Sequence, residues 1–203
     1  MSIIEHIVRL VAPHECLGCT TEDHLLCPAC VTALPSAFPV VLPGIDRVWA
    51  ATRYEGVTKA VLYRLKFGRA QAAAQDIANC LADRLPEESN WLVTHVPTVP
   101  ARVRQRGYDQ AKLIARAFAA RRGLAYVPLL TRLGNQRQLG ADRVQRHQQM
   151  VSAFRPLKNC LIYNSPVLLI DDVLTTGATL EAAAQTLRAA GVVRIDAAVF
   201  AHA

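Results

Sequence analysis

The sequence has 203 residues, of which 52% are hydrophobic and 19% charged, a composition that can bury a full core and excludes an intrinsically disordered chain. Lysine and arginine number 23 against 16 aspartates and glutamates, and the formal charge of +7 favours anionic partners such as phosphate esters, nucleic acid or acidic lipid. Residues 3–11 are apolar but interrupted by charges and short of the roughly 20 residues that span a membrane, and no secretory signal pattern is present, so we expect no membrane insertion and a cytoplasmic location.

Two Cys-x-x-Cys pairs stand near the start of the chain, at Cys16, Cys19, Cys27 and Cys30. Each pair forms a tight turn that aims two sulfurs at one point, and four thiolates complete a tetrahedral zinc site. Because metal binding can supply the folding free energy of a small segment, we expect residues 1–34 to form a zinc-binding finger in which the zinc is structural. A redox pair and two disulfides are the other interpretations of this spacing, and His14 or His24 could replace one ligand.

The first 44 residues carry one basic and four acidic side chains. Since this negative charge repels phosphates, the finger is expected to have a structural or protein-contact role rather than to read DNA. In the protein-contact hypothesis, it docks a partner through Leu17, Leu25 and Leu26. The prolines and the glycine of residues 35–44 indicate a linker, after which residues 45–203 are expected to form the main domain.

The middle of the chain combines a predicted strand, a predicted helix and a strongly basic stretch. Residues 91–96 are expected to form the strand, and the helix that follows has an apolar face made of Ala111, Ile114, Ala115 and Phe118. Residues 101–147 hold eleven basic and two acidic side chains, and ten of the eleven are arginines. Arginine binds phosphate oxygens in pairs, so the stretch favours a phosphate-bearing partner, with a solvated basic face as the other interpretation.

The most informative stretch begins at residue 167. Residues 167–170 form a wholly apolar run, typical of a buried parallel strand, which ends at Asp171 and Asp172. A turn of small residues follows, made of Thr175, Thr176, Gly177, Ala178 and Thr179. A helix with apolar residues at helical spacing is then expected to run to Gly191.

A strand, a turn and a helix in this order aim backbone N–H groups at a phosphate. The two carboxylates accept hydrogen bonds, which suits the vicinal hydroxyls of a sugar and a divalent cation. Together these features predict a sugar-phosphate site, and the absence of Walker and GxGxxG patterns argues against a nucleoside triphosphate or a dinucleotide. An ordinary strand–helix turn with surface acids is the other interpretation.

Residues 167–179 resemble the signature of type I phosphoribosyltransferases, which bind 5-phosphoribosyl 1-pyrophosphate (PRPP). The resemblance implies that Asp171 and Asp172 hold the ribose hydroxyls with Mg²⁺ and that residues 175–179 hold the 5-phosphate. It also implies an α/β fold with a central, mostly parallel sheet, flanking helices and a flexible hood. Thr175 stands where purine-salvage members have an acid that acts as a general base, which indicates a different branch of the family.

The remaining motifs are similar to the ComF (GntX-like) family, which is associated with natural competence. Residues 102–110 resemble its Arg-x-Arg-Gly-aromatic-Asn-Gln segment, with Asp109 in place of the usual asparagine. Upstream, Tyr54 and the Leu65-Lys66-Phe67 triplet match its first helix. Downstream matches are Arg132, Gln138 and the Ala153-Phe154 pair, with Asn135 in place of a threonine.

This second resemblance implies that Arg104 and Arg106, in the loop after strand 91–96, contact the pyrophosphate of PRPP and that Lys66 is a further ligand-binding residue. Residues 132–146 would form the hood. The implied function is PRPP binding together with a part in DNA uptake, in which single-stranded DNA is handled on the cytoplasmic side beside a DNA-translocating ATPase or helicase. Relatives with this fold often form homodimers. The alternative is an active phosphoribosyltransferase that moves ribose 5-phosphate from PRPP to a nucleobase-like acceptor.

Overall fold

The computed structural model describes residues 14–68, 70–133, 153–157 and 165–203, and its centre is a four-stranded parallel sheet. The strand order is β1 (Arg47–Arg53), β6 (Ile195–His202), β5 (Val167–Leu174) and β2 (Leu92–His95). The sequence predicted that β5 would end at residue 170. It extends to Leu174 because the acid pair and the residues after it continue the pairing with β6, as in Asp171 opposite Val199.

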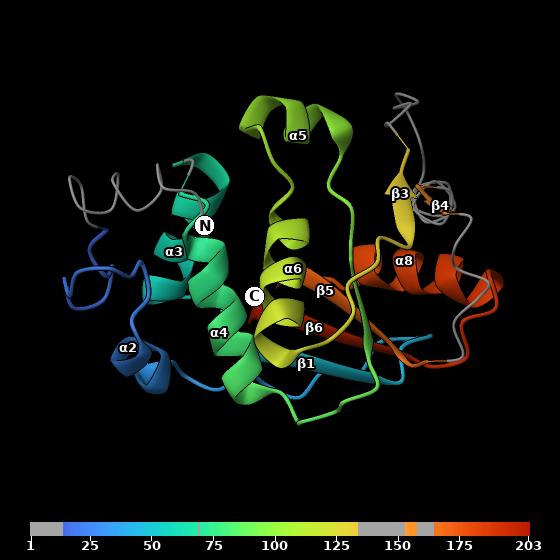
Figure 1. Cartoon of the computed structure of the whole chain (residues 1–203), viewed down its shortest axis with the longest axis horizontal. Helices are drawn as coiled ribbons and strands as arrows, with labels where there is room; N and C mark the ends of the chain where they lie inside the picture. Colours follow the sequence, from blue (N-terminus) through green and yellow to red (C-terminus); the bar gives the residue numbers. More distant parts are fainter. Residues whose placement is uncertain (1–13, 69, 134–152, 158–164) are drawn as a thin grey trace.

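Helices cover both faces of this sheet, as the apolar strand residues require. On one face lie α3 (Gly56–Phe67), α4 (Ala73–Arg84) and α6 (Gln110–Arg122), with α4 and α6 in front of the sheet in Figure 1. On the other face lies α8 (Ala178–Ala189). Alternate residues of β5 serve the two cores: Leu168 and Ile170 join the first, and Val167 and Leu169 join the second.

Smaller elements stand at the edges of this three-layer unit. The short helices are α2 (Pro28–Ala33) and α5 (Pro100–Arg106), and the second sheet pairs β3 (Leu130–Arg132) with β4 (Phe154–Pro156) in antiparallel fashion. The sequence predicted a loop where α5 forms. Most of the predicted hood, including Gln138, lies outside the described residues. Within the described ranges, no helix has the length and apolar character needed to cross a membrane.

The cysteine segment, defined here as residues 14–34, packs against the main core. Leu25 and Leu26 are 1% and 2% exposed and belong to the cluster that includes α4. Asp76 of α4 accepts hydrogen bonds from both of their backbone N–H groups, at 2.8 and 3.1 Å. The expectation that Leu25 and Leu26 dock a partner is therefore wrong, because both side chains are already buried within the chain. Leu17 alone of the three is exposed.

The predicted linker, residues 35–44, also contributes to the core. Leu42 is buried in the cluster of α8, and Val40 bridges to Val48 of β1. This proline-containing stretch is therefore packed against the main domain and is not a free linker. The domain boundaries at residues 34 and 44 stay a prediction. Leu25 and Leu26, before the first boundary, belong to the core cluster of α4, and Leu42 and Ile45, on either side of the second, belong to the core cluster of α8.

Candidate functional site

The acid pair lies in the carboxyl-terminal half of β5, near the edge where parallel strands present their loops to a ligand. The Oδ2 of Asp172 lies 2.9 Å from the Nζ of Lys66, which is supplied by the last turn of α3. The Oδ1 of Asp171 accepts the backbone N–H of Asp172 at 2.8 Å. The structure thus brings together three residues that the sequence assigned to the site from distant segments.

Asp171 occupies an environment that disfavours its ionised form. Burial raises the pKa of the Asp171 carboxyl well above its ordinary value, and the neighbouring Asp172 raises it further, while Lys66 acts in the opposite direction. A divalent cation or a set of sugar hydroxyls would offset this effect, because both favour the ionised carboxylate. The donor set therefore fits a magnesium-bound sugar phosphate.

The turn after β5 forms a small hollow at the start of α8. Its volume is about 30 Å³, and it is lined by Asp171, Val173, Leu174, Thr175, Thr176, Gly177, Ala178, Thr179 and Leu180. Thr175 and Thr176 are exposed, and among the described residues no side chain caps the first turn of α8, so hydroxyls and backbone N–H groups remain as donors for an anion. All five predicted turn residues line this hollow together with Asp171.

Gly177 is required by the backbone of this turn. It has a φ of +83°, and a Cβ at this position would lie 2.4 Å from Cδ2 of Leu42. Any side chain would be strained and would also collide with residue 42. The linker therefore packs directly on the turn that is predicted to hold the phosphate.

The two predicted pyrophosphate residues lie on α5 and not in a loop. Arg104 is exposed, and the guanidinium of Arg106 lies 5.2 Å from the ring centroid of Phe67 and donates to Oε1 of Gln110 at 3.0 Å. Among the described residues, neither arginine has an ion pair or hydrogen bond to the acid pair. Their pyrophosphate role stays a prediction.

Asp109, which replaces the family's asparagine, has a clear structural task. Its carboxylate accepts the backbone N–H of Lys112 as the N-cap of α6 and the backbone N–H of Thr98 at 2.8 Å. It therefore fixes both ends of the connection that carries α5. The two bonds go to different carboxylate oxygens, Oδ1 for Lys112 and Oδ2 for Thr98, whereas an asparagine would offer a single acceptor oxygen.

Two residues near the acid pair were not assigned to the site from the sequence. His95 pairs with Ile170 in the sheet and is 5% exposed. Its Nδ1 lies 2.9 Å from the hydroxyl of Tyr126. Burial lowers the pKa of His95 to about 4, so the ring is neutral. Arg132 of β3 stacks on Phe154, and its buried Nε finds no hydrogen-bond partner among the described residues. Burial lowers the pKa of Arg132, and the charge of Asp171 opposes that shift. In the sequence, the match of Arg132 to the family motif was the one signal for that residue, and His95 had none.

The four predicted zinc ligands converge as expected. Their sulfur atoms all lie within 4.8 Å of one another, with 3.5 Å between Cys19 and Cys27, close to the roughly 3.8 Å that 2.3 Å zinc–sulfur bonds give in a tetrahedron. Hydrogen bonds from Thr21 lower the pKa of Cys19 to about 6, whereas the neighbouring Cys19 sulfur raises the pKa of Cys30 to about 12. The cluster thus fits a metal ion, which would hold all four as thiolates.

Cys80 and His24 stand apart from this cluster. Cys80 is fully buried, and burial raises its pKa to about 11. Cys160 lies outside the described residues. His24 hydrogen-bonds to Asp76 at 3.1 Å, and the metal-capable group found within the described ranges contains cysteines alone.

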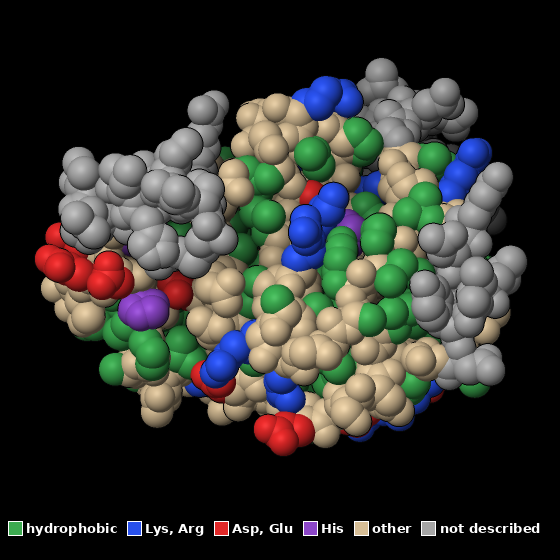
Figure 2. All heavy atoms as spheres, in the orientation of Figure 1, with side chains coloured by type: hydrophobic (Ala, Val, Ile, Leu, Met, Phe, Trp, Pro, Cys, Tyr) green, Lys and Arg blue, Asp and Glu red, His purple; other side chains and the backbone are tan. Residues whose placement is uncertain are grey.

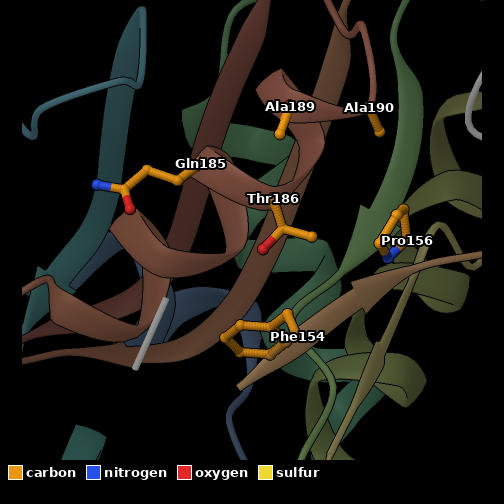
Figure 3. Close-up of a pocket in the computed structure, with 6 residues that line it drawn as sticks. All are labelled: Phe154, Pro156, Gln185, Thr186, Ala189 and Ala190. Atoms are coloured by element: carbon orange, nitrogen blue, oxygen red, sulfur yellow. The ribbon is translucent and has the colours of Figure 1, made fainter. Parts of the chain in front are cut away.

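Charge and shape distinguish the surfaces around these sites. Figure 2 shows acidic side chains gathered over the cysteine segment, where Glu15, Glu22 and Asp23 are exposed, and basic side chains over α5. A larger hollow of about 280 Å³ lies between α8 and β4 (Figure 3). Its lining consists of Phe154, Pro156, Gln185, Thr186, Ala189 and Ala190, none of which is ionisable. The acid pair and its turn are therefore the better ligand site.

Comparison with known proteins agrees with this geometry. Residues 73–203 match the family described as phosphoribosyl transferase domain. The competence protein ComFC of Bacillus subtilis (strain 168) is 30% identical over 138 residues, which cover 66% of this chain and 55% of that protein. The DNA utilization protein YhgH of Salmonella typhimurium is 27% identical over 193 residues, covering 85% of this chain and 82% of that protein.

The chain spans only 55% and 60% of the length of ComFC from Bacillus subtilis and Streptococcus pneumoniae. Among solved structures, the glutamine PRPP amidotransferase from B. subtilis has a TM-score of 0.47 at 19% identity, over 64% of this chain and 26% of that one. Adenine phosphoribosyltransferase from Leishmania tarentolae has a TM-score of 0.38 at 17% identity, over 64% and 70% of the two chains.

Proposed function

The chain belongs to the phosphoribosyl transferase domain family, as a member of its ComF branch, and on this basis we propose that it binds PRPP with Mg²⁺ and assists DNA uptake. The observation that carries the first part is the acid pair at the end of β5, followed by the threonine turn at the start of α8. The acid pair favours hydroxyls and a cation, whereas the turn favours an anion. The two subsites lie within a few residues of each other.

The residues divide the ligand between them. Asp171 and Asp172 accept hydrogen bonds from the ribose hydroxyls, and the hydroxyls and N–H groups of residues 175–179 donate to the 5-phosphate. Lys66, already 2.9 Å from Asp172, adds a positive charge beside the phosphates. When bound, Mg²⁺ supplies further neutralisation of the pyrophosphate charge. Arg104 and Arg106 are proposed to face the pyrophosphate.

The DNA part of the proposal is supported by the relatives and by charge. Two kinds of relative are named for competence and for DNA utilization, and residues 101–147 carry nine more basic than acidic side chains. We place the protein in the cytoplasm, where it handles incoming single strands beside a DNA-translocating ATPase or helicase, and we propose that it forms a homodimer. Zinc at the four cysteines has a structural role in this proposal.

Calorimetry with PRPP and Mg²⁺ tests the ligand. Asp172→Asn removes one charged acceptor and the partner of Lys66, and PRPP affinity should fall roughly 10–100-fold, as expected for a charged hydrogen bond of about 1.5–3 kcal/mol. Asp83→Asn is the matched control, since Asp83 is an exposed acid of α4 that pairs with Arg121 at 3.7 Å, outside the hollow. Equal affinity in parent and Asp172→Asn would refute the assignment.

An active transferase is the second candidate, and Arg132 favours it. The charge of Asp171 raises the pKa of its partly buried guanidinium, and its Nε has no hydrogen-bond partner among the described residues, as expected of a group that binds an anion. In that reaction the bond between ribose C1 and the pyrophosphate oxygen breaks, and pyrophosphate leaves with the electron pair. A nitrogen of the acceptor forms the new bond to C1 and loses its proton to solvent. Release of pyrophosphate with any nucleobase in a panel would establish the activity, and none with any base would exclude it for that panel.

A further inference from the structure

Helix α3 carries an exposed aromatic pair that packing does not explain. Tyr63 and Phe67 are 63% and 61% exposed, and their ring centroids lie 5.1 Å apart. They stand four residues apart on one face of α3, whereas the opposite face supplies the buried residues Thr58, Val61, Leu62 and Leu65. Their rings therefore contribute little to the core and are presented to solvent.

The surroundings of this pair are strongly basic. Helix α3 contains Lys59, Arg64 and Lys66, helix α5 contains Arg102, Arg104 and Arg106, and neither helix contains an acid. The two helices meet through the guanidinium of Arg106, which lies 5.2 Å from the ring centroid of Phe67. Figure 2 shows basic side chains over α5, which stands at the top of the view in Figure 1.

Aromatic rings interleaved with cations match the chemistry of an unpaired polynucleotide strand. Its bases can stack on exposed rings whatever their identity, and its phosphates are neutralised by lysine and arginine. A duplex offers only the second of these interactions, because its bases are already stacked on one another. An apolar protein partner would use the rings but not the cations beside them.

We propose that single-stranded DNA binds across α3 and α5, with bases stacked on Tyr63 and Phe67 and phosphates on Arg64, Arg102 and Arg104. This inference rests on the proposed DNA role and adds where the strand binds and how it is recognised. The basic stretch 101–147 contains few aromatic residues, and the fold supplies the stacking groups from α3 instead. Lys66 connects the two sites, since the helix that presents the rings also reaches Asp172.

The test measures the anisotropy of a fluorescein-labelled oligo-dT with the full chain, at two salt concentrations. Tyr63→Ala and Phe67→Ala should each weaken binding about tenfold, within the range known for one base stacked on an aromatic ring. Arg102→Gln should reduce the slope of log affinity against log salt by about 0.7, the value for one phosphate contact on a single strand. Unlabelled duplex of the same length should compete poorly.

Two further variants separate stacking from other causes. Phe38→Ala is the matched control, because Phe38 is 62% exposed and has the Arg53 guanidinium 4.3 Å from its ring centroid, but lies outside α3 and α5. It should bind oligo-dT as the parent does. Tyr63→Leu keeps apolar area and removes the ring, so it should be as weak as Tyr63→Ala. Normal affinity in Tyr63→Leu, or an equal loss in Phe38→Ala, would overturn the proposal.

A wrong binding location and a wrong proposed DNA function would give different results in this experiment. Tyr63→Ala should keep the parent's thermal unfolding midpoint and its PRPP affinity. If the parent does not bind oligo-dT, the DNA part of the proposed function fails and this inference with it. If the parent binds and the two aromatic variants bind equally well, only the location across α3 and α5 is overturned.

Discussion

Replacing Asp171 by asparagine should stabilise the ligand-free protein and weaken its binding of PRPP. The carboxyl of Asp171 is half-buried beside Asp172, and both its desolvation and that neighbour raise its pKa. Removing its charge therefore relieves a cost that the empty protein carries. The negative charge of Asp171 is also the one proposed to bind the ribose hydroxyls of PRPP.

The structure limits the effect to the loss of that charge. Asparagine keeps the Oδ1 that accepts the N–H of Asp172 at 2.8 Å, and the 2.9 Å contact between Lys66 and Asp172 is not touched. Relief of this kind is worth about 0.5–2 kcal/mol, and each kcal/mol raises the melting temperature of a chain of this size by about 2–4 °C. PRPP affinity should fall by roughly 10–100-fold, for a lost charged hydrogen bond of about 1.5–3 kcal/mol.

The stabilisation should depend on pH with a definite sign. The folded-state pKa of Asp171 lies above its unfolded value, so the parent loses stability as pH rises through the folded pKa. The advantage of Asp171→Asn is therefore full above that pKa and disappears as pH falls and the parent's carboxyl becomes protonated. By the same logic, PRPP–Mg²⁺ binding by the parent should weaken as pH falls through that pKa.

The assay is thermal unfolding of both proteins in steps from about pH 8 to pH 4, with calorimetry of PRPP at the upper end. Asp83→Asn serves as the control, because its side chain is 57% exposed and pairs with Arg121 only at 3.7 Å. A difference in melting temperature that is absent, negative or independent of pH would refute the reasoning about burial. Unchanged PRPP affinity would refute the role in binding.

Three further changes test the frame around the site. Asp76→Ala leaves two buried backbone donors unsatisfied and should cost about 2–5 kcal/mol in denaturant unfolding; unchanged hydrogen-exchange protection of the Leu25 and Leu26 amides would contradict this. Gly177→Ala should lower the free energy of unfolding by about 1–2 kcal/mol from its positive φ, plus the cost of the collision with Leu42. The double variant with Leu42→Ala should therefore lose less stability than the sum of the two single variants, and strict additivity would argue against the contact. Removal of the metal by a chelator should lower the melting temperature of the whole chain in one calorimetric transition, because the cysteine segment shares the main core, and two separate transitions would speak for an independent finger.

The sequence predicted best those features that depend on local pattern. The apolar run 167–170, the small-residue turn and the periodic helix after it gave the strand, the turn and α8 in the right order. The extension of β5 through Asp171 was not foreseen, because acids usually end a buried strand. Pairing with β6 holds them in the sheet, since the register continues from Asp171 opposite Val199 to Leu174 opposite His202.

Features that depend on contacts between distant segments could not be predicted from pattern. The 2.9 Å approach of Lys66 to Asp172 follows from how α3 packs beside the sheet, and only the family resemblance had put both residues in one site. Likewise, no periodicity shows that Asp76 holds the cysteine segment or that Phe67 meets Arg106. Leu25 and Leu26 read as exposed docking residues because a segment so rich in cysteine and charge gave no sign of a core to join.

The contact between Leu42 and Gly177 limits what protein engineering can do with the amino-terminal part of the chain. Replacing residues 35–44 by a glycine–serine spacer would preserve the reach between the cysteines and the sheet but remove the side chain that covers the back of the turn. A truncated version beginning at β1 would lose the same cover. Shortened forms of this protein should therefore retain residue 42 if they are to report on ligand affinity.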